Sequence, residues 1–125
     1  MNRFNSATHI STHFDKELEE IREKVFAMGD LVAQQLDLAI EAFTNGNVEL
    51  AMQVLKQDDV IDGYESDIDQ KCAATIALRQ PTGHDLDLLI AVIKVTSELE
   101  GIAAKIEGIA DITLKLNIIS SRQLR

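Results

Sequence analysis

The chain has few of the side chains that bind nucleic acid. It contains no Trp, one Tyr and four Phe, and its 12 Lys and Arg residues are outnumbered by 21 Asp and Glu residues, which gives a formal net charge of −9. Such a surface repels phosphate backbones, and few aromatic rings are present to stack on bases. Nucleic acid is therefore not expected as a partner.

Cysteine and proline are almost absent, with one residue of each. Cys72 has no second cysteine with which to form an intrachain disulfide. Its position in an apolar helical pattern predicts a small buried hydrophobic side chain rather than a reactive thiol. Pro81 is expected to end a helix, because proline has no backbone N–H to donate within one.

Long apolar runs are also missing. None approaches the roughly 20 residues that a helix needs to cross a bilayer, and the N-terminal stretch lacks the apolar run of a secretory signal. We therefore expect no membrane insertion and a cytoplasmic location. With 125 residues, of which 46% are hydrophobic, the chain has enough apolar material for one domain with a modest core.

Hydrophobic residues recur at steps of three and four in three long segments, which predicts three helices. The helices are expected near residues 14–45, 48–78 and 83–117. Two clusters of helix-breaking residues separate them, at Thr44–Asn47 and at Arg79–Gly83, and connections this short favour antiparallel neighbours. The predicted fold is a single all-α domain over residues 1–125, an antiparallel three-helix bundle. The residues expected in its core include Ile21, Val25, Ile68, Ile93 and Ile106.

The ends of these helices carry recognisable capping signals. Ser11 or Thr12, followed by Asp15, predicts the start of the first helix, because a hydroxyl group can accept a hydrogen bond from the first free backbone N–H groups. Gly46 can adopt the left-handed conformation that ends this helix, and Asn47 can cap the next one.

Acidic residues return at steps of three and four along the second predicted helix, which places them on one side of it. They are Asp58, Asp62, Glu65 and Asp69. The third predicted helix carries a second acidic stripe, made of Glu100, Glu107 and Asp111. Both stripes border apolar faces. They are either a solvated edge or, if the two helices are neighbours, a cluster of hard oxygen ligands for divalent or iron cations.

Two histidines, His9 and His13, are four residues apart and would share one face of a helix that began early. Histidines at this spacing can bind a metal ion, but the sequence does not place a third and fourth ligand beside them. The alternative is that both are ordinary polar residues near the start of the helix.

The first half of the third predicted helix is apolar nearly all round. Leu88, Val92, Val95 and Leu99 form one arc, and Leu86, Leu89, Ile90 and Ile93 form the opposite arc. Both arcs cannot face one bundle axis, so the first arc is predicted to form a subunit interface, with a homodimer as the expected assembly. The alternative is that the other two helices cover this segment within one monomer.

Several short runs keep a fixed order along residues 9–113. They are His9-Ile10, Phe14, Glu17-Leu18 and Ile21; then Asp58, Asp62, Glu65 through Asp69 and Cys72; then Arg79-Gln80-Pro81 with Asp85-Leu86; and finally Lys94 with Glu98-Leu99-Glu100. In this order they resemble the PhoU family, the regulatory accessory proteins of bacterial phosphate transport systems. The resemblance implies a non-catalytic regulator of phosphate uptake and phosphate signalling that contacts a phosphate ABC transporter or its sensor histidine kinase.

The resemblance also implies metal binding by Glu/Asp-x-x-x-Asp motifs, which the two pairs of acids on the second helix satisfy. On the third helix, the family run Glu-Leu-Glu-Arg-Ile-Gly-Asp is replaced by Glu-Leu-Glu-Gly-Ile-Ala-Ala at Glu98–Ala104. The Arg and the Asp are both lost, so this part of the metal site is expected to be reduced, with Glu107 and Asp111 as displaced ligands. Family members carry two three-helix repeats, and a homodimer is expected to supply the second.

The sequence shows no arrangement that is typical of catalysis. It has no Gly-rich phosphate loop, no nucleophile with a base placed to activate it, and no Glu-x-x-His pair of the di-iron bundles. The alternatives to a phosphate regulator are a structural helical adaptor, a regulator of a different transporter, and an enzyme that uses carboxylate-bound metal.

Overall fold

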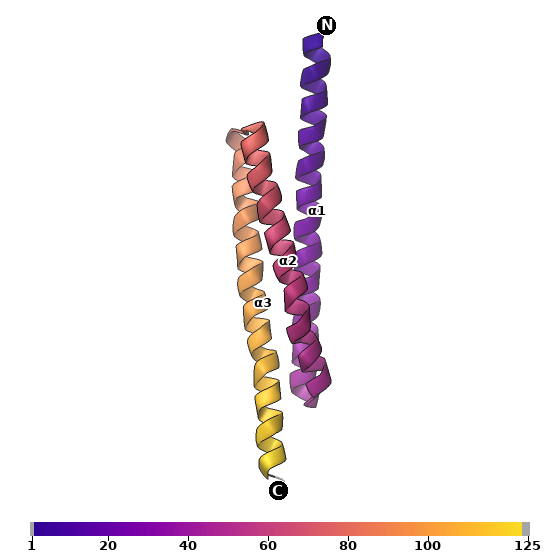
Figure 1. Ribbon diagram of the computed structural model, residues 1–125, viewed down its shortest axis with the longest axis vertical. Coiled ribbons are helices and arrows are strands. Elements are labelled where there is room, and N and C mark those ends of the chain that lie inside the picture. The colour runs from indigo at the N-terminus through magenta and orange to yellow at the C-terminus, as the bar shows by residue number, and fades with distance from the viewer. Residues whose placement is uncertain (1, 124–125) are drawn as a thin grey trace.

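The computed structural model describes the backbone of residues 2–123 and the side chains of residues 13–122. It contains three helices, α1 (Asn2–Asn45), α2 (Val48–Arg79) and α3 (Gly83–Gln123), and each of them contacts the other two. The helices lie along one long axis, with α2 running against α1 and α3 (Figure 1). No strand occurs in the described part of the chain, so the predicted antiparallel three-helix bundle is confirmed.

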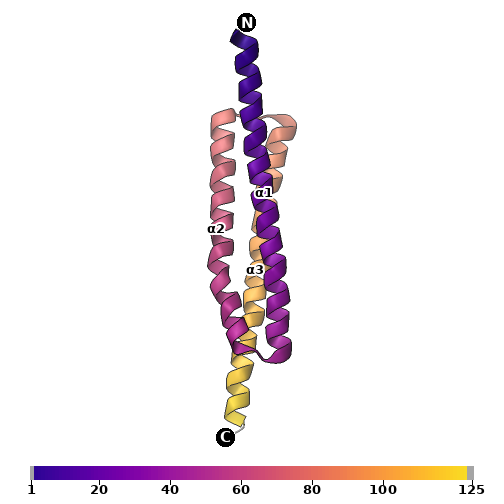
Figure 2. The same cartoon turned by 90° about the vertical axis from the view of Figure 1, so that its right-hand side faces the viewer.

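Two of the helices are longer than the hydrophobic pattern predicted. α1 begins at Asn2 rather than near residue 14, so the predicted start at Ser11 or Thr12 is wrong. α3 continues to Gln123 instead of ending near residue 117. Neither extension contains Gly or Pro, and so nothing in it interrupts a helix. The two extensions project beyond the rest of the bundle at opposite ends (Figure 2).

The two histidines that could share one face of a helix lie in the first part of α1. The side chain of His9 lies outside the described residues, and His13 is exposed. Over the residues that the structure describes, none of the helices has an apolar stretch long enough to cross a bilayer.

Both connections lie where the helix-breaking residues predicted them. Gly46 has a φ of 63°, and the Oδ1 of Asn47 accepts a hydrogen bond of 3.1 Å from the backbone N–H of Leu50, which caps α2. At the second connection, Gln80 has a φ of 46° and Gly83 a φ of 58°. Residues in this left-handed region end helices and turn the chain, and glycine adopts it without strain.

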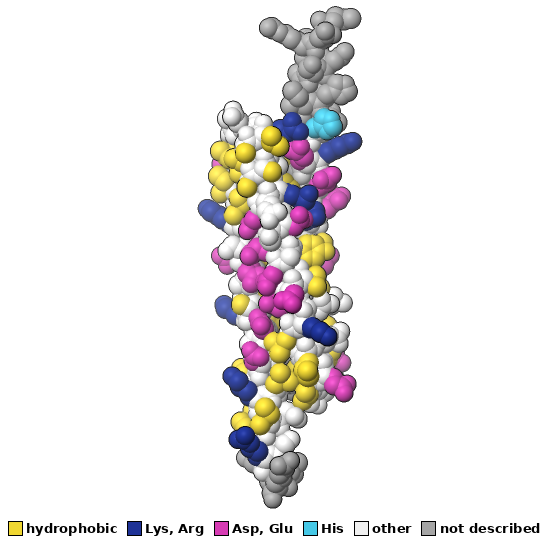
Figure 3. Space-filling model, viewed as in Figure 1, with side chains coloured by type: hydrophobic (Ala, Val, Ile, Leu, Met, Phe, Trp, Pro, Cys, Tyr) yellow, Lys and Arg dark blue, Asp and Glu magenta, His cyan; other side chains and the backbone are white. Residues whose placement is uncertain are grey.

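Charged side chains join α1 to α2. Lys24 forms an ion pair with Asp67, and Arg79 donates hydrogen bonds of 2.7 and 3.4 Å to the two carboxylate oxygens of Glu17. We call this boundary the α1/α2 seam. Partly exposed pairs of this kind add little stability, but they fix the register of the two helices. Asp and Glu side chains also gather midway along the face that α2 presents in Figure 3.

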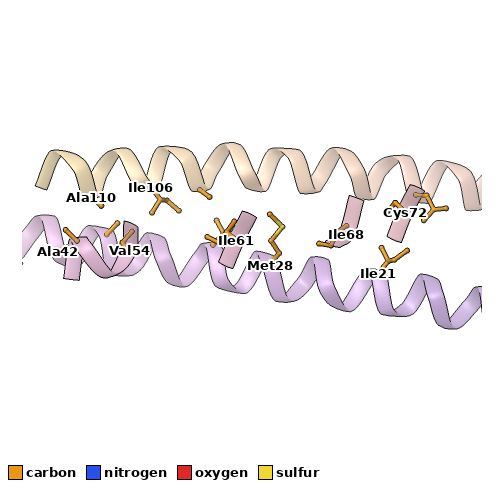
Figure 4. Close-up of a cluster of buried hydrophobic side chains, with 14 residues drawn as sticks. Ile21, Met28, Ala42, Val54, Ile61, Ile68, Cys72, Ile106 and Ala110 are labelled. Carbon is orange, nitrogen blue, oxygen red and sulfur yellow. The ribbon is translucent and has the colours of Figure 1, made fainter. Parts of the chain in front are cut away.

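The core runs along the axis between the three helices (Figure 4). Ile21, Ile68 and Ile106 are buried, with at most 3% of each side chain exposed, as predicted. Val25 and Ile93 are only half-buried, but they pack against the core. The predicted core is therefore confirmed for three residues and partly for two.

Two side chains of this core are chemically distinct. Cys72 has no exposed surface, and its burial, with a smaller effect from the charge of Asp69, raises the pKa of its thiol to about 11. The thiol therefore stays protonated at neutral pH, as expected for an inert buried cysteine. Gln35 is also buried, and its Oε1 has no hydrogen-bond partner. The sequence pattern did not predict this polar group in the core.

Candidate functional site

The two acidic stripes lie along the boundary between α2 and α3, which we call the α2/α3 seam. On α2, Asp58 and Glu65 are half-buried, whereas Asp62 and Asp69 are exposed. On α3, Glu100 and Glu107 are half-buried and Asp111 is exposed. The helical spacing of three and four residues places each stripe on one side of its helix, next to the buried residues of the core.

Carboxyl groups of the two stripes meet across the seam. The carboxyl group of Glu107 lies beside that of Asp58, and the carboxyl group of Glu100 lies beside that of Asp62. In each pair the aspartate raises the pKa of the glutamate. Two carboxyl groups can share a hydrogen bond only if one of them carries a proton. A proton on the glutamate would allow such a bond in each pair. The structure thus brings together four of the seven predicted ligands.

Glu100 lies at the centre of this cluster. Its burial first, and then the negative charges of Asp62, Glu65 and Asp58, raise the pKa of its carboxyl group to about 7. Its Oε2 is buried and has no hydrogen-bond partner. A buried carboxyl group among other carboxylates is stabilised either by a proton or by a cation, because each removes the repulsion between negative charges.

The neighbouring acids show the same effect. Burial is the largest cause that raises the pKa values of Asp58, Glu65 and Glu107, and the charges of nearby carboxylates raise them further. No three His, Cys, Asp or Glu side chains within the described residues are arranged as the ligands of one metal ion. The acids therefore lie in pairs across the seam. The atoms that they could offer to a metal ion are all carboxylate oxygens.

The predicted interface residues lie on the other side of α3, toward α1. Val95 is 47% exposed. Leu88 and Val92 line a cavity of about 310 Å³ between α1 and α3, and Val92 and Leu99 also pack against the core. Val95 is thus the one residue of the four that is exposed, whereas the other three are half-buried within the described chain. The interface remains a prediction.

Sequence reasoning missed the contacts that depend on how the helices are aligned. The ion pairs of Lys24 with Asp67 and of Glu17 with Arg79 join residues far apart in the sequence. Glu17 and Arg79 belong to the short runs that resemble the PhoU family, but nothing in those runs indicated that the two side chains meet.

Known proteins are similar to this chain over most of its length. The phosphate-specific transport system accessory protein PhoU of Serratia marcescens is 48% identical over 102 residues, which cover 82% of this chain and 42% of that protein. The PhoU homologue of Aquifex aeolicus is 45% identical over 96 residues, which cover 77% of this chain and 43% of that protein. The chain therefore spans less than half the length of these two relatives.

Solved structures show the same similarity. The phosphate transport system regulatory protein PhoU of Streptococcus pneumoniae superposes with a TM-score of 0.77 at 31% identity, covering 81% of this chain and 48% of that one. PhoU of Pseudomonas aeruginosa superposes with a TM-score of 0.81 at 36% identity, covering 83% of this chain and 50% of that one. The profile of the PhoU domain matches residues 25–113, and the chain belongs to the PhoU family.

Proposed function

We propose that this chain is a non-catalytic regulator of phosphate uptake and phosphate signalling. It acts by contacting a phosphate ABC transporter or its sensor histidine kinase, and contact with such partners calls for a cytoplasmic location. The observation that carries the proposal is 45–48% identity, over about four fifths of the chain, to accessory proteins of phosphate-specific transport systems. We also propose that the chain works as a homodimer.

The chemistry of the described side chains supports a role in binding. The α2/α3 seam presents carboxylate oxygens, which attract cations or basic side chains, and the one thiol of the chain is buried and protonated. A hydrolytic or redox reaction would need an activated nucleophile or a redox-active group beside this cluster.

The seam also supports a proposal of metal binding. Glu100 Oε2 is a buried oxygen without a hydrogen-bond partner. Asp62 and Asp58 lie near the carboxyl group of Glu100, and Glu107 lies beside Asp58. The chemistry of these side chains suits a divalent or iron cation, because hard cations prefer carboxylate oxygens. Their arrangement in pairs means that the side chains of both pairs would have to turn toward one ion to bind it. A bound cation would supply the positive charge that now has to come from protons. Asp58, Asp62, Glu100 and Glu107 would hold it, with Glu65, Asp69 and Asp111 beside them.

Two other functions would use the same fold. A structural helical adaptor would bind a partner unrelated to phosphate transport, and a regulator of a different transporter would bind the components of that transporter. Affinity capture separates them, because each function requires a different partner.

We predict that the tagged full chain, captured from phosphate-replete cells of its own source, retains the ATPase subunit of the phosphate transporter or the phosphate sensor kinase. Mass spectrometry of the captured material measures this, with the tag alone as the control. Recovery of the subunits of another transporter would favour the second alternative. Recovery of neither class would contradict the proposed function.

A further inference from the structure

Each helix of the bundle contains a glycine in its interior. They are Gly29 in α1, Gly63 in α2 and Gly101 in α3. Glycine in the interior of a helix favours the non-helical state roughly two- to fivefold relative to alanine, because its backbone is freer once the helix is broken. A Cβ atom at any of the three positions would meet no described atom within 4 Å. The packing of the described residues therefore does not require glycine there.

The three glycines lie at one level of the bundle. Equal counts back from the short connection between α1 and α2 bring Gly29 and Gly63 to within about one residue of the same height. Asp62 and Glu100, which lie side by side, directly precede Gly63 and Gly101 in the sequence. Because each residue advances a helix by 1.5 Å, the three glycines are within about 5 Å of one another along the axis.

Other features near this level favour movement. Met28, which has no exposed surface, lies between Ile61 and Ile68 along the core (Figure 4). Its unbranched side chain adapts to a changed space more readily than the branched isoleucines do. On α3, about one and a half turns from this level, the hydroxyl of Thr96 donates a hydrogen bond of 2.8 Å to the carbonyl oxygen of Val92. Hydroxyl bonds of this kind often bend helices.

The helices are joined differently on the two sides of this level. Both ion pairs of the described residues, Lys24 with Asp67 and Glu17 with Arg79, lie on the side of the α2–α3 connection. The other side, which ends at the α1–α2 connection, contains the buried Gln35, whose Oε1 has no hydrogen-bond partner. A buried polar atom without a partner disfavours the closed core, because it has lost its hydrogen bonds to water. This half of the bundle is therefore held less firmly.

The α2/α3 seam crosses the level of the glycines. The pair of Asp62 and Glu100 lies at this level. The pair of Asp58 and Glu107 lies about one helical turn away, toward the α1–α2 connection. A bend of the bundle at the glycines therefore changes the distance between the two pairs without separating the members of either pair.

We propose that Gly29, Gly63 and Gly101 form one hinge, at which the two halves of the bundle bend relative to each other. The bend brings the two pairs of carboxyl groups in the α2/α3 seam toward each other, so that both can face one cation. The hinge itself follows from the fold, whereas its use in cation binding rests on the proposed function.

Hydrogen exchange of the full chain in the presence of a chelator, followed by NMR, tests the hinge. The amides in the turn that follows each glycine are expected to exchange at least ~10-fold faster than buried amides elsewhere in the same helix, because they open locally. If the three helices bend together, a stiffer α1 restrains the other two. Gly29→Ala is therefore expected to slow exchange roughly two- to fivefold beside Gly63 and Gly101 as well as in α1.

Gly108 provides the matched control. It also lies inside α3, and a Cβ atom there would likewise meet no described atom within 4 Å, but it is about two turns away from Gly101. Gly108→Ala should slow exchange only in the adjacent turns of α3. Both substitutions raise helix propensity equally, so a rise in global stability affects both variants alike. The difference between the two variants reports the hinge.

Binding of Mn²⁺ tests the use of the hinge. The triple variant Gly29→Ala, Gly63→Ala and Gly101→Ala keeps every carboxylate of the seam. It is expected to bind Mn²⁺ at least ~10-fold more weakly than the native chain in equilibrium dialysis, because the bent state becomes rarer. Gly108→Ala should bind Mn²⁺ as the native chain does.

Uniform exchange along the native helices, or slowing that stays within α1 in the Gly29→Ala variant, would overturn the hinge. Equal Mn²⁺ affinity of the triple variant and the native chain would overturn its use in cation binding. A native chain that binds no Mn²⁺ would remove that use together with the proposed metal binding, whereas the exchange measurement would still decide the hinge. The phosphate function is decided by the captured partners and can fail separately.

Discussion

Replacing Ile68 by Ala is expected to lower the free energy of unfolding by roughly 2–5 kcal/mol, which is the range for truncation of a fully buried branched side chain. Ile68 has no exposed surface and lies in the middle of the core between the three helices (Figure 4). Removing its outer carbons would leave a cavity, because the long helices on either side cannot collapse locally to fill it. Urea unfolding followed by circular dichroism measures the loss.

The matched control is Val60→Ala, eight residues earlier on the same helix. Val60 is 47% exposed, so its truncation should change the free energy of unfolding by no more than about 0.5 kcal/mol. Equal losses at the two positions would show that residues 60 and 68 do not differ in burial, and would contradict the packing of α2 described above.

Replacing Glu100 by Gln is expected to stabilise the fold at pH 8 in the presence of a chelator, by on the order of 1–3 kcal/mol. The pKa of Glu100 is raised from 4.5 to about 7 in the folded chain, chiefly by burial. Above pH 7 the folded state therefore has to hold a negative charge that the surroundings disfavour. Glutamine has nearly the same shape and carries no charge.

The sign of the pH dependence follows from the same shift. Below about pH 4.5 the carboxyl group is protonated in both states, and it costs no stability. Between about pH 4.5 and 7 the unfolded chain loses this proton first, so the native protein should lose stability as the pH rises. The advantage of Glu100→Gln should therefore grow across this window and then stay constant.

Chemical unfolding at several pH values measures this effect, with Asp37→Asn, an exposed acid of α1, as the control. A variant that is no more stable than the native chain at pH 8 would contradict a raised pKa of the half-buried carboxyl group at position 100. With a saturating divalent cation in place of the chelator, the proposed metal binding predicts the opposite order, because only the native chain would keep all its ligands.

The hydrophobic period was sufficient to predict the bundle, because each helix repeats its apolar residues over many turns and strong helix breakers stand at both connections. It could not predict where α1 begins. Residues 2–13 carry little regular apolar pattern, so the sequence offered only the capping signal at Ser11 or Thr12. In the structure both residues lie inside α1, which begins at Asn2. Residues 2–13 contain no Gly or Pro, so no residue among them interrupts the helical backbone.

The acidic stripes were also visible in the sequence, because three- and four-residue spacing places side chains on one side of a helix. The sequence did not show which acid of one stripe lies beside which acid of the other. The meeting of Asp62 with Glu100 depends on the relative shift of α2 and α3 along the axis, and a periodic pattern does not contain this shift. Gln35 was missed for a different reason. It lies three residues after the buried Val32 and four before the buried Ala39, but a polar side chain is not expected at such a core position.

We propose that the α2/α3 seam is the functional site and that its carboxylates bind a cation. Equilibrium dialysis of the chelator-stripped full chain against Fe, Mn, Zn and Ni, followed by metal analysis, tests this most directly. We predict stoichiometric uptake by the native chain and by the control variant Asp37→Asn with Glu41→Gln, two exposed acids of α1. Asp62→Asn with Glu100→Gln should lose that uptake. No uptake by the native chain, or uptake that survives the seam variant, would contradict the claim.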